Sequence, residues 1–104
     1  MRSIYKYEIT DQGMPLNAPI TRFLSLQVQN DKICVWAEVD TEMEDRHFLF
    51  IIVGTGWELD KLNNFDKATY LNSVQCFNGE YVWHIYYLEL NTPYENIEEL
   101  RTDK

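Results

Sequence analysis

The chain has few basic residues for its acidic content. Its 104 residues include 9 Lys and Arg against 17 Asp and Glu, a formal net charge of -8. Contacts to a phosphate backbone need clustered Lys and Arg, so this balance argues against non-specific binding of DNA or RNA. The chain also lacks an apolar run approaching the roughly 20 residues of a membrane span. With no signal peptide before Tyr5, we expect a cytosolic protein without a membrane partner.

Motifs for metal or redox chemistry are missing as well. The two cysteines, Cys34 and Cys76, do not form a Cys-x-x-Cys pair and lie in strand-like segments, so we interpret them as reduced core thiols. The two histidines, His47 and His84, have no ligand spacing. The sequence therefore predicts no bound metal and no cofactor.

No group of residues forms a recognisable catalytic motif. No serine lies in a Gly-x-Ser-x-Gly elbow. Glu42, Glu44 and Asp45 fit a solvated loop better than an acid–base pair, because a chain this rich in carboxylates places some together by chance. His84 fits a packed or partly exposed strand residue better than a general base. We therefore predict that the protein is not an enzyme.

Alternation of apolar and polar residues predicts a mainly β fold. Six segments read as strands: 4–9, 23–29, 32–40, 47–53, 68–77 and 80–90. Asn30-Asp31 and Asn78-Gly79 predict hairpin turns between neighbouring strands. The nearly continuous apolar run 47–53 is typical of a central strand that is covered on both faces.

The remaining segments predict loops and one helix. Residues 11–19 hold a glycine and two prolines and are interpreted as a loop, and 58–67 as a loop or a single helical turn. Thr92-Pro93-Tyr94-Glu95 has the pattern of a capping box. We expect a small antiparallel β barrel or sandwich of about six strands at residues 1–90, and a short C-terminal helix in an extension at 91–104.

The segment Gly54-Thr55-Gly56 follows the apolar run and allows two interpretations. It lacks the remaining residues of a Walker loop and of a dinucleotide fingerprint. In the first interpretation, the glycines only bend the end of a strand. Alternatively, backbone N–H groups and the Thr55 hydroxyl meet an anionic or carbonyl-rich ligand. The adjacent Trp57 favours the second interpretation, because an aromatic face beside hydrogen-bond donors suits a nucleobase.

Aromatic and basic residues supply further candidates. Strand alternation places Trp36, Trp83 and Tyr87 on outward faces, where they form either a binding or oligomer surface or a second core layer. Arg22 and Arg46 are candidate partners for phosphate groups.

An ordered set of short segments resembles a family of small uncharacterised proteins from tailed bacteriophages and prophages. The resemblance covers residues 4–89 and is specific only as a set. In that family the Gly-Thr-Gly is typically followed by His, where this chain has Trp57. The segments are Tyr5-Lys6-Tyr7, Leu24-Ser25-Leu26-Gln27-Val28-Gln29-Asn30, Cys34-Val35-Trp36-Ala37-Glu38-Val39-Asp40, Gly54-Thr55-Gly56, Val74-Gln75 and Val82-Trp83-His84.

This resemblance implies a phage origin and an accessory role in the host cytoplasm. We expect a non-enzymatic protein that counters host defence by sequestering a small anionic signal, such as a cyclic nucleotide, in a site shared between subunits of a homo-oligomer. The alternatives are an acidic inhibitor of a host protein, which would imitate DNA, and a minor virion or assembly component. The expected ligand-binding residues are Gly54, Thr55, Gly56, Trp57, Arg22, Arg46, Trp36, Trp83 and His84.

Overall fold

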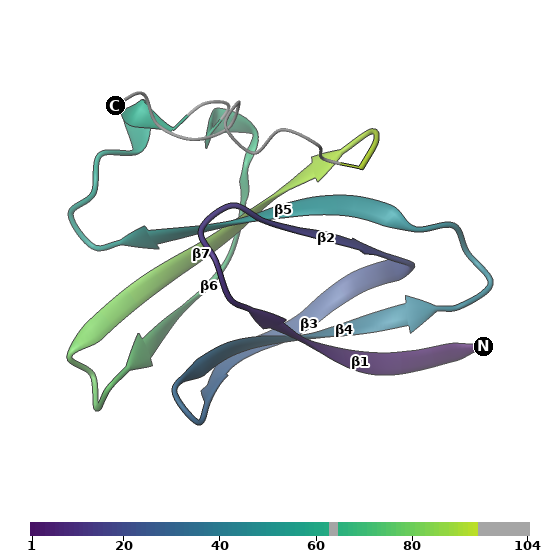
Figure 1. The fold of residues 1–104 in the computed structure, drawn as a ribbon, viewed down its shortest axis with the longest axis horizontal. Helices are drawn as coiled ribbons and strands as arrows, with labels where there is room; N and C mark the ends of the chain where they lie inside the picture. The colour runs from purple at the N-terminus through teal and green to yellow at the C-terminus, as the bar shows by residue number, and fades with distance from the viewer. Residues whose placement is uncertain (63–64, 94–104) are drawn as a thin grey trace.

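The computed structural model describes residues 1–62 and 65–93. These residues form seven β-strands in two antiparallel sheets, with two short 3-10 turns between the fifth and sixth strands (Figure 1). The strands are β1 (Arg2–Ile9), β2 (Met14–Ala18), β3 (Ile20–Gln29), β4 (Lys32–Asp40), β5 (Arg46–Gly54), β6 (Thr69–Cys76) and β7 (Tyr81–Leu90). The 3-10 turns are η1 (Leu59–Lys61) and η2 (Phe65–Lys67).

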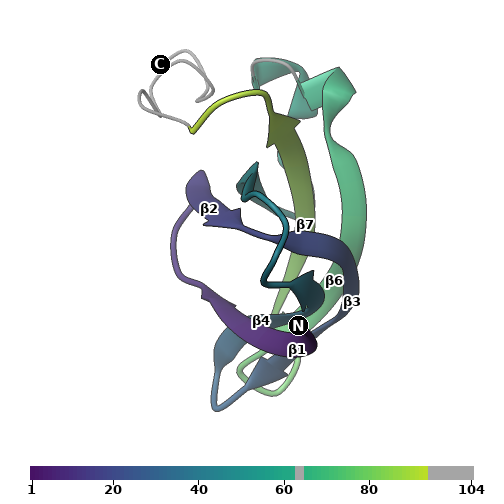
Figure 2. The ribbon, with the colours of Figure 1, turned by 90° about the vertical axis from the view of Figure 1, so that its right-hand side faces the viewer.

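The two sheets form a sandwich. One sheet has the order β1-β4-β3 and the other β2-β5-β7-β6. The chain passes between the sheets directly, because β2 and β3 are separated only by Pro19 yet belong to different sheets. The edge strands β3 and β6 of the two sheets lie side by side (Figure 2). The predicted antiparallel β fold is therefore confirmed, with a sandwich and not a closed barrel in the described residues.

The loop predicted at residues 11–19 was wrong, because this segment contains β2. Met14, Leu16 and Ala18 are at least partly covered while the residues between them are exposed, as in a half-buried strand. Pro15 argued against a strand because it has no N–H to donate. It is tolerated because β2 is an edge strand that pairs only with β5.

Most of the predicted C-terminal helix lies outside the described residues. The described residues after β7 are Asn91, Thr92 and Pro93, and residues 94–104 lie outside the described part of the chain. The segment 58–67, predicted as a loop or a single helical turn, carries two short 3-10 turns, η1 and η2, in its described residues, one more than predicted.

The main core lies between the sheets. Alternate residues of β4 face it, with Val35, Ala37 and Val39 fully buried, as their spacing predicted. Phe48 and Phe50 of β5 face them from the other sheet and pack edge-on against Phe23. These residues hold the two sheets together.

The outer face of the four-stranded sheet is also covered. Leu49, Ile51 and Val53 of β5 are buried there, in a cluster with residues such as Leu62 and Phe65 from the segment that precedes β6. This second layer confirms that β5 is covered on both faces, and it explains why its sequence is apolar without alternation.

Both predicted hairpins are present, and one carries an unusual residue. Asn30 and Asp31 take positive φ at the β3–β4 turn, which suits their side chains. At the β6–β7 turn, positive φ begins one residue before Asn78-Gly79, at Phe77, whose φ is 55°. An L-residue pays about 1–2 kcal/mol for this conformation. The Phe77 ring is 53% exposed, so little burial offsets that strain.

Candidate functional site

The segment Gly54-Thr55-Gly56 forms a turn at the end of β5, so its glycines bend the chain there. The Trp57 N–H donates to the Gly54 carbonyl at 3.1 Å, and Gly56 takes a φ of 91° that favours glycine. Gly54 matters for a different reason, because a Cβ there would lie 2.7 Å from Trp57 Nε1 and would displace the indole from this position. The turn at Gly56 and the missing side chain at Gly54 allow the Trp57 indole to lie against the backbone of Gly54.

The Trp57 indole is fixed in place yet half exposed. It packs edge-on against Trp83, with ring centroids 5.8 Å apart and an interplanar angle of 79°. Its exposed fraction is nevertheless 53%. An aromatic ring that is already ordered loses little conformational entropy when a ligand stacks on it.

A chain of hydrogen-bonded side chains begins beside this indole. Thr55 Oγ1 lies 2.8 Å from His84 Nε2, and Ser73 Oγ lies 2.7 Å from His84 Nδ1. The Tyr70 hydroxyl in turn lies 2.7 Å from Ser73 Oγ. The β6–β7 register places Ser73 directly opposite His84, and the β5–β7 register pairs His84 with Val53, two residues before Thr55.

These hydrogen-bonded side chains allow the Thr55 hydroxyl to act either as a donor or as an acceptor. A neutral imidazole has one donor and one acceptor nitrogen, so one neighbouring hydroxyl donates to the ring and the other accepts from it. Exchange of the His84 tautomer reverses the direction of the hydrogen bonds. The Thr55 hydroxyl can therefore either accept from or donate to a polar atom that approaches it.

Thr55, Trp57 and His84 line a shallow cavity of about 240 Å³, which we call the turn cavity; Val53, Gly54, Gly56, Leu59 and Tyr86 complete it. Five of the nine predicted site residues thus come together here: Gly54, Thr55, Gly56, Trp57 and His84. A sixth, Trp83, supports Trp57 from the side.

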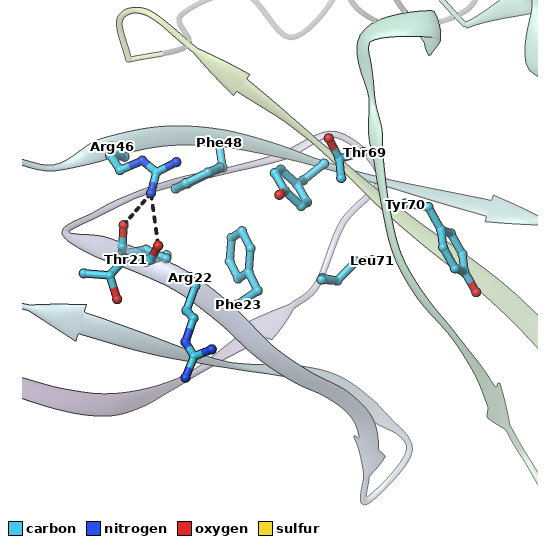
Figure 3. A pocket seen from close by; sticks show the side chains of 10 residues that line it. Thr21, Arg22, Phe23, Arg46, Phe48, Thr69, Tyr70 and Leu71 are labelled. Atoms are coloured by element: carbon cyan, nitrogen blue, oxygen red, sulfur yellow. Dashed lines mark hydrogen bonds between the residues drawn. The ribbon is translucent and has the colours of Figure 1, made fainter.

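The two arginines lie elsewhere, at a cavity of about 260 Å³ that we call the arginine pocket (Figure 3). Arg46 Nε and Nη2 each donate to the Glu89 carboxylate at 2.7 Å, and its Nη1 donates to the Ile20 carbonyl at 2.9 Å. Arg22 points away from Arg46 and lies 3.5 Å from Glu38 Oε1. The structure does not place either arginine in the turn cavity.

Trp36, Trp83 and Tyr87 were predicted to lie on outward faces, and this was correct only for Trp36. Trp36 lies on the outer face of the three-stranded sheet, with Lys6 Nζ 5.9 Å from its ring centroid. Trp83 and Tyr87 pack against the core between the sheets instead. Their register explains this, because Tyr87 pairs with the buried Phe50 and so shares its face. The alternative of a second core layer therefore holds for these two residues.

The Arg46–Glu89 pair predicts an acid-sensitive contribution to stability. The hydrogen bond from Arg46 lowers the pKa of Glu89, so the stabilisation is present above the ordinary carboxyl pKa and is lost as pH falls through the lowered value. Both side chains are more than a third exposed, which limits the effect. Glu89→Gln should reduce the free energy of unfolding at neutral pH by up to about 1 kcal/mol. Urea unfolding should show this difference vanish in acid; an unchanged difference would contradict it.

Two residues of the site were missed by sequence reasoning: Ser73 and Tyr70. The signal was present, because a two-residue turn at Asn78-Gly79 pairs Ser73 with His84 by counting outward from the turn. Tyr70 could not be placed in this way, because the β6–β7 register shifts between Tyr70 and Asn72.

Fold and site together define a small antiparallel β-sandwich that carries an exposed indole beside a hydroxyl–imidazole chain. The chain belongs to the family described as Domain of unknown function (DUF7352), whose model matches residues 1–95. Nothing matches it among curated proteins or among solved structures. In the described residues, no helix has the length and apolar character to cross a membrane. The described residues also contain no group of three or more His, Cys, Asp or Glu side chains that could hold a metal ion.

Proposed function

We propose that this protein binds a small nucleotide signal at the turn cavity and sequesters it without hydrolysis. The observation that carries this proposal is the half-exposed Trp57 indole held beside the Thr55–His84 hydrogen bond. A nucleobase needs a flat apolar surface for its face and polar atoms for its edge, and this site offers both within one turn of chain.

The site favours the base over the phosphates of a nucleotide. Arg46 is engaged by Glu89 and Ile20, and Arg22 lies near Glu38, so neither supplies a cation to the turn cavity. In our proposal the base stacks on Trp57 and bonds to Thr55, while the phosphates face solvent. Recognition then depends on the identity of the base more than on the number of phosphates.

The biological setting of the proposal comes from the resemblance to tailed-phage proteins. An accessory phage protein that holds a nucleotide signal in the host cytoplasm would counter a host defence by lowering the free signal concentration. Sequestration needs no catalytic step, only a tight site and enough protein to match the signal.

Calorimetric titration with a panel of cyclic and linear nucleotides tests this function. We expect at least one nucleotide to bind with a Kd below about 10 μM, equivalent to roughly -7 kcal/mol. Denaturing the complex should then release that nucleotide intact. Failure of every nucleotide to bind in this range would contradict the proposal. Turnover in proportion to protein would instead assign a catalytic role to Thr55 and His84.

We also propose that a second copy of the chain completes the site. The turn cavity, at about 240 Å³, falls below the roughly 300–1,000 Å³ of typical small-molecule sites. A second chain over this opening would enclose a nucleotide that one chain leaves exposed. Light scattering at micromolar concentration should therefore show a dimer or larger species, at least when nucleotide is bound. A monomer in both conditions would contradict the shared site.

The net charge of -8 favours one other function, the inhibition of a basic host protein. This alternative predicts tight, salt-sensitive binding to a basic protein and no nucleotide binding. The same titrations separate the two functions, because only the first one depends on Trp57.

A further inference from the structure

A second cavity is lined by residues of both sheets, among them Ile33 of β4 and Ile52 of β5. It lies beside the β3–β4 and β6–β7 turns, which are at the same end of the molecule (Figure 1). We call it the hairpin cavity. Its volume is about 380 Å³, larger than the turn cavity and within the roughly 300–1,000 Å³ range of small-molecule sites. Its floor is apolar and includes Ile9, Ile33 and Ile52 from three strands.

Three aromatic residues form one side of the hairpin cavity. Trp57 and Trp83 stand nearly perpendicular, at 79°, and both line the cavity, so they form two walls of a corner. Phe77 lines it from the β6–β7 turn. Its positive φ and exposed ring are not explained by packing, since its one ring contact within the described residues is with Tyr81, at 5.7 Å. Strain of this kind gathers at ligand sites.

The charged residues at the hairpin cavity are mainly acidic. Glu8 and Asp31 line it together with a single base, Lys32. Lys32 Nζ lies 4.0 Å from Glu8 Oε1, so its charge is matched by one of the two carboxylates. The excess carboxylate and the chain's net charge of -8 both attract cations toward this opening.

We propose that the hairpin cavity binds a small organic cation, an alkylammonium ion of about the size of choline. Aromatic faces attract such a cation through the ring quadrupole, and carboxylates at the mouth balance its charge. The apolar floor accommodates the alkyl groups, which a hydrated metal ion does not carry. This site is separate from the nucleotide function: Phe77, Glu8 and Asp31 do not line the turn cavity, and Trp57 alone borders both.

A matched pair of probes tests the charge dependence. Choline and its neutral isostere 3,3-dimethylbutan-1-ol have nearly the same shape, and only choline is charged. In calorimetric titrations of the full chain, we expect choline to bind at least about tenfold more tightly than the alcohol. Equal affinities, or no choline binding at millimolar concentration, would overturn the proposal.

Variants locate the site. Phe77→Asn removes the ring and keeps a residue that tolerates positive φ, so we expect a folded protein with choline affinity reduced roughly three- to thirtyfold. Glu8→Gln with Asp31→Asn should weaken choline binding similarly, without touching the aromatic side chains.

The control is Glu44→Gln with Asp45→Asn, which removes the same charge from the exposed loop at the opposite end of the molecule (Figure 1). Choline affinity should fall by less than about twofold there, because screening weakens distant exposed charges. An equal loss in the control and the Glu8–Asp31 double variant would overturn the assigned position, as would unchanged affinity in Phe77→Asn. Nucleotides are titrated separately, so failure of the nucleotide proposal leaves this result interpretable.

Discussion

Replacing Phe50 by alanine should lower the free energy of unfolding by about 3–5 kcal/mol. Phe50 is fully buried in the core between the two sheets, with its ring 5.6 Å from that of Phe23. The substitution removes apolar contacts and leaves a cavity that the paired strands cannot close. A domain of this length has about 5–15 kcal/mol of stability in total, so Phe50→Ala should leave a marginal fold.

Urea unfolding monitored by tryptophan fluorescence measures this effect. The matched control is Phe77→Ala, which also replaces a phenylalanine by alanine, but at an exposed turn. It should change the free energy of unfolding by no more than about 0.5 kcal/mol. Similar losses in the two variants would show that the core between the sheets is not where the stability resides.

Replacing Trp57 by alanine should weaken nucleotide binding about five- to hundredfold. Stacking of a base on an aromatic side chain contributes roughly 1–3 kcal/mol, and 1.4 kcal/mol corresponds to a factor of ten in Kd. The fold should survive, because Trp57 follows the end of β5 in a turn and half of its surface is exposed. Calorimetry measures the loss, and a thermal melt on the same samples checks the fold.

Most of the fold could be predicted from residue periodicity. All six predicted strands are present, and the Asn30-Asp31 and Asn78-Gly79 turns fix two of the hairpins. β2 was missed because Gly13 and Pro15 mark a loop by composition, and the position of β2 at a sheet edge, which makes Pro15 acceptable, is a property of the assembled sheet.

The candidate site was predicted only in part, for physical reasons that differ between residues. Gly54, Thr55 and Trp57 are neighbours in sequence, so their proximity could be foreseen. The inward faces of Trp83 and Tyr87 could not, because β7 has covered residues on both faces and its pattern does not say which face meets the other sheet. The positions of Arg22 and Arg46 depend on ion pairs with Glu38 and Glu89, which are set by the pairing of distant strands.

The most direct test of the proposed site compares two tryptophan variants by calorimetry with the nucleotide that binds the wild type most tightly. Trp57→Ala removes the indole of the turn cavity, and Trp36→Ala removes one from the outer face of the other sheet. We predict an affinity loss of about five- to hundredfold for Trp57→Ala and less than about twofold for Trp36→Ala. Equal affinities for wild type and a folded Trp57→Ala protein would contradict the assignment of the turn cavity as the nucleotide site.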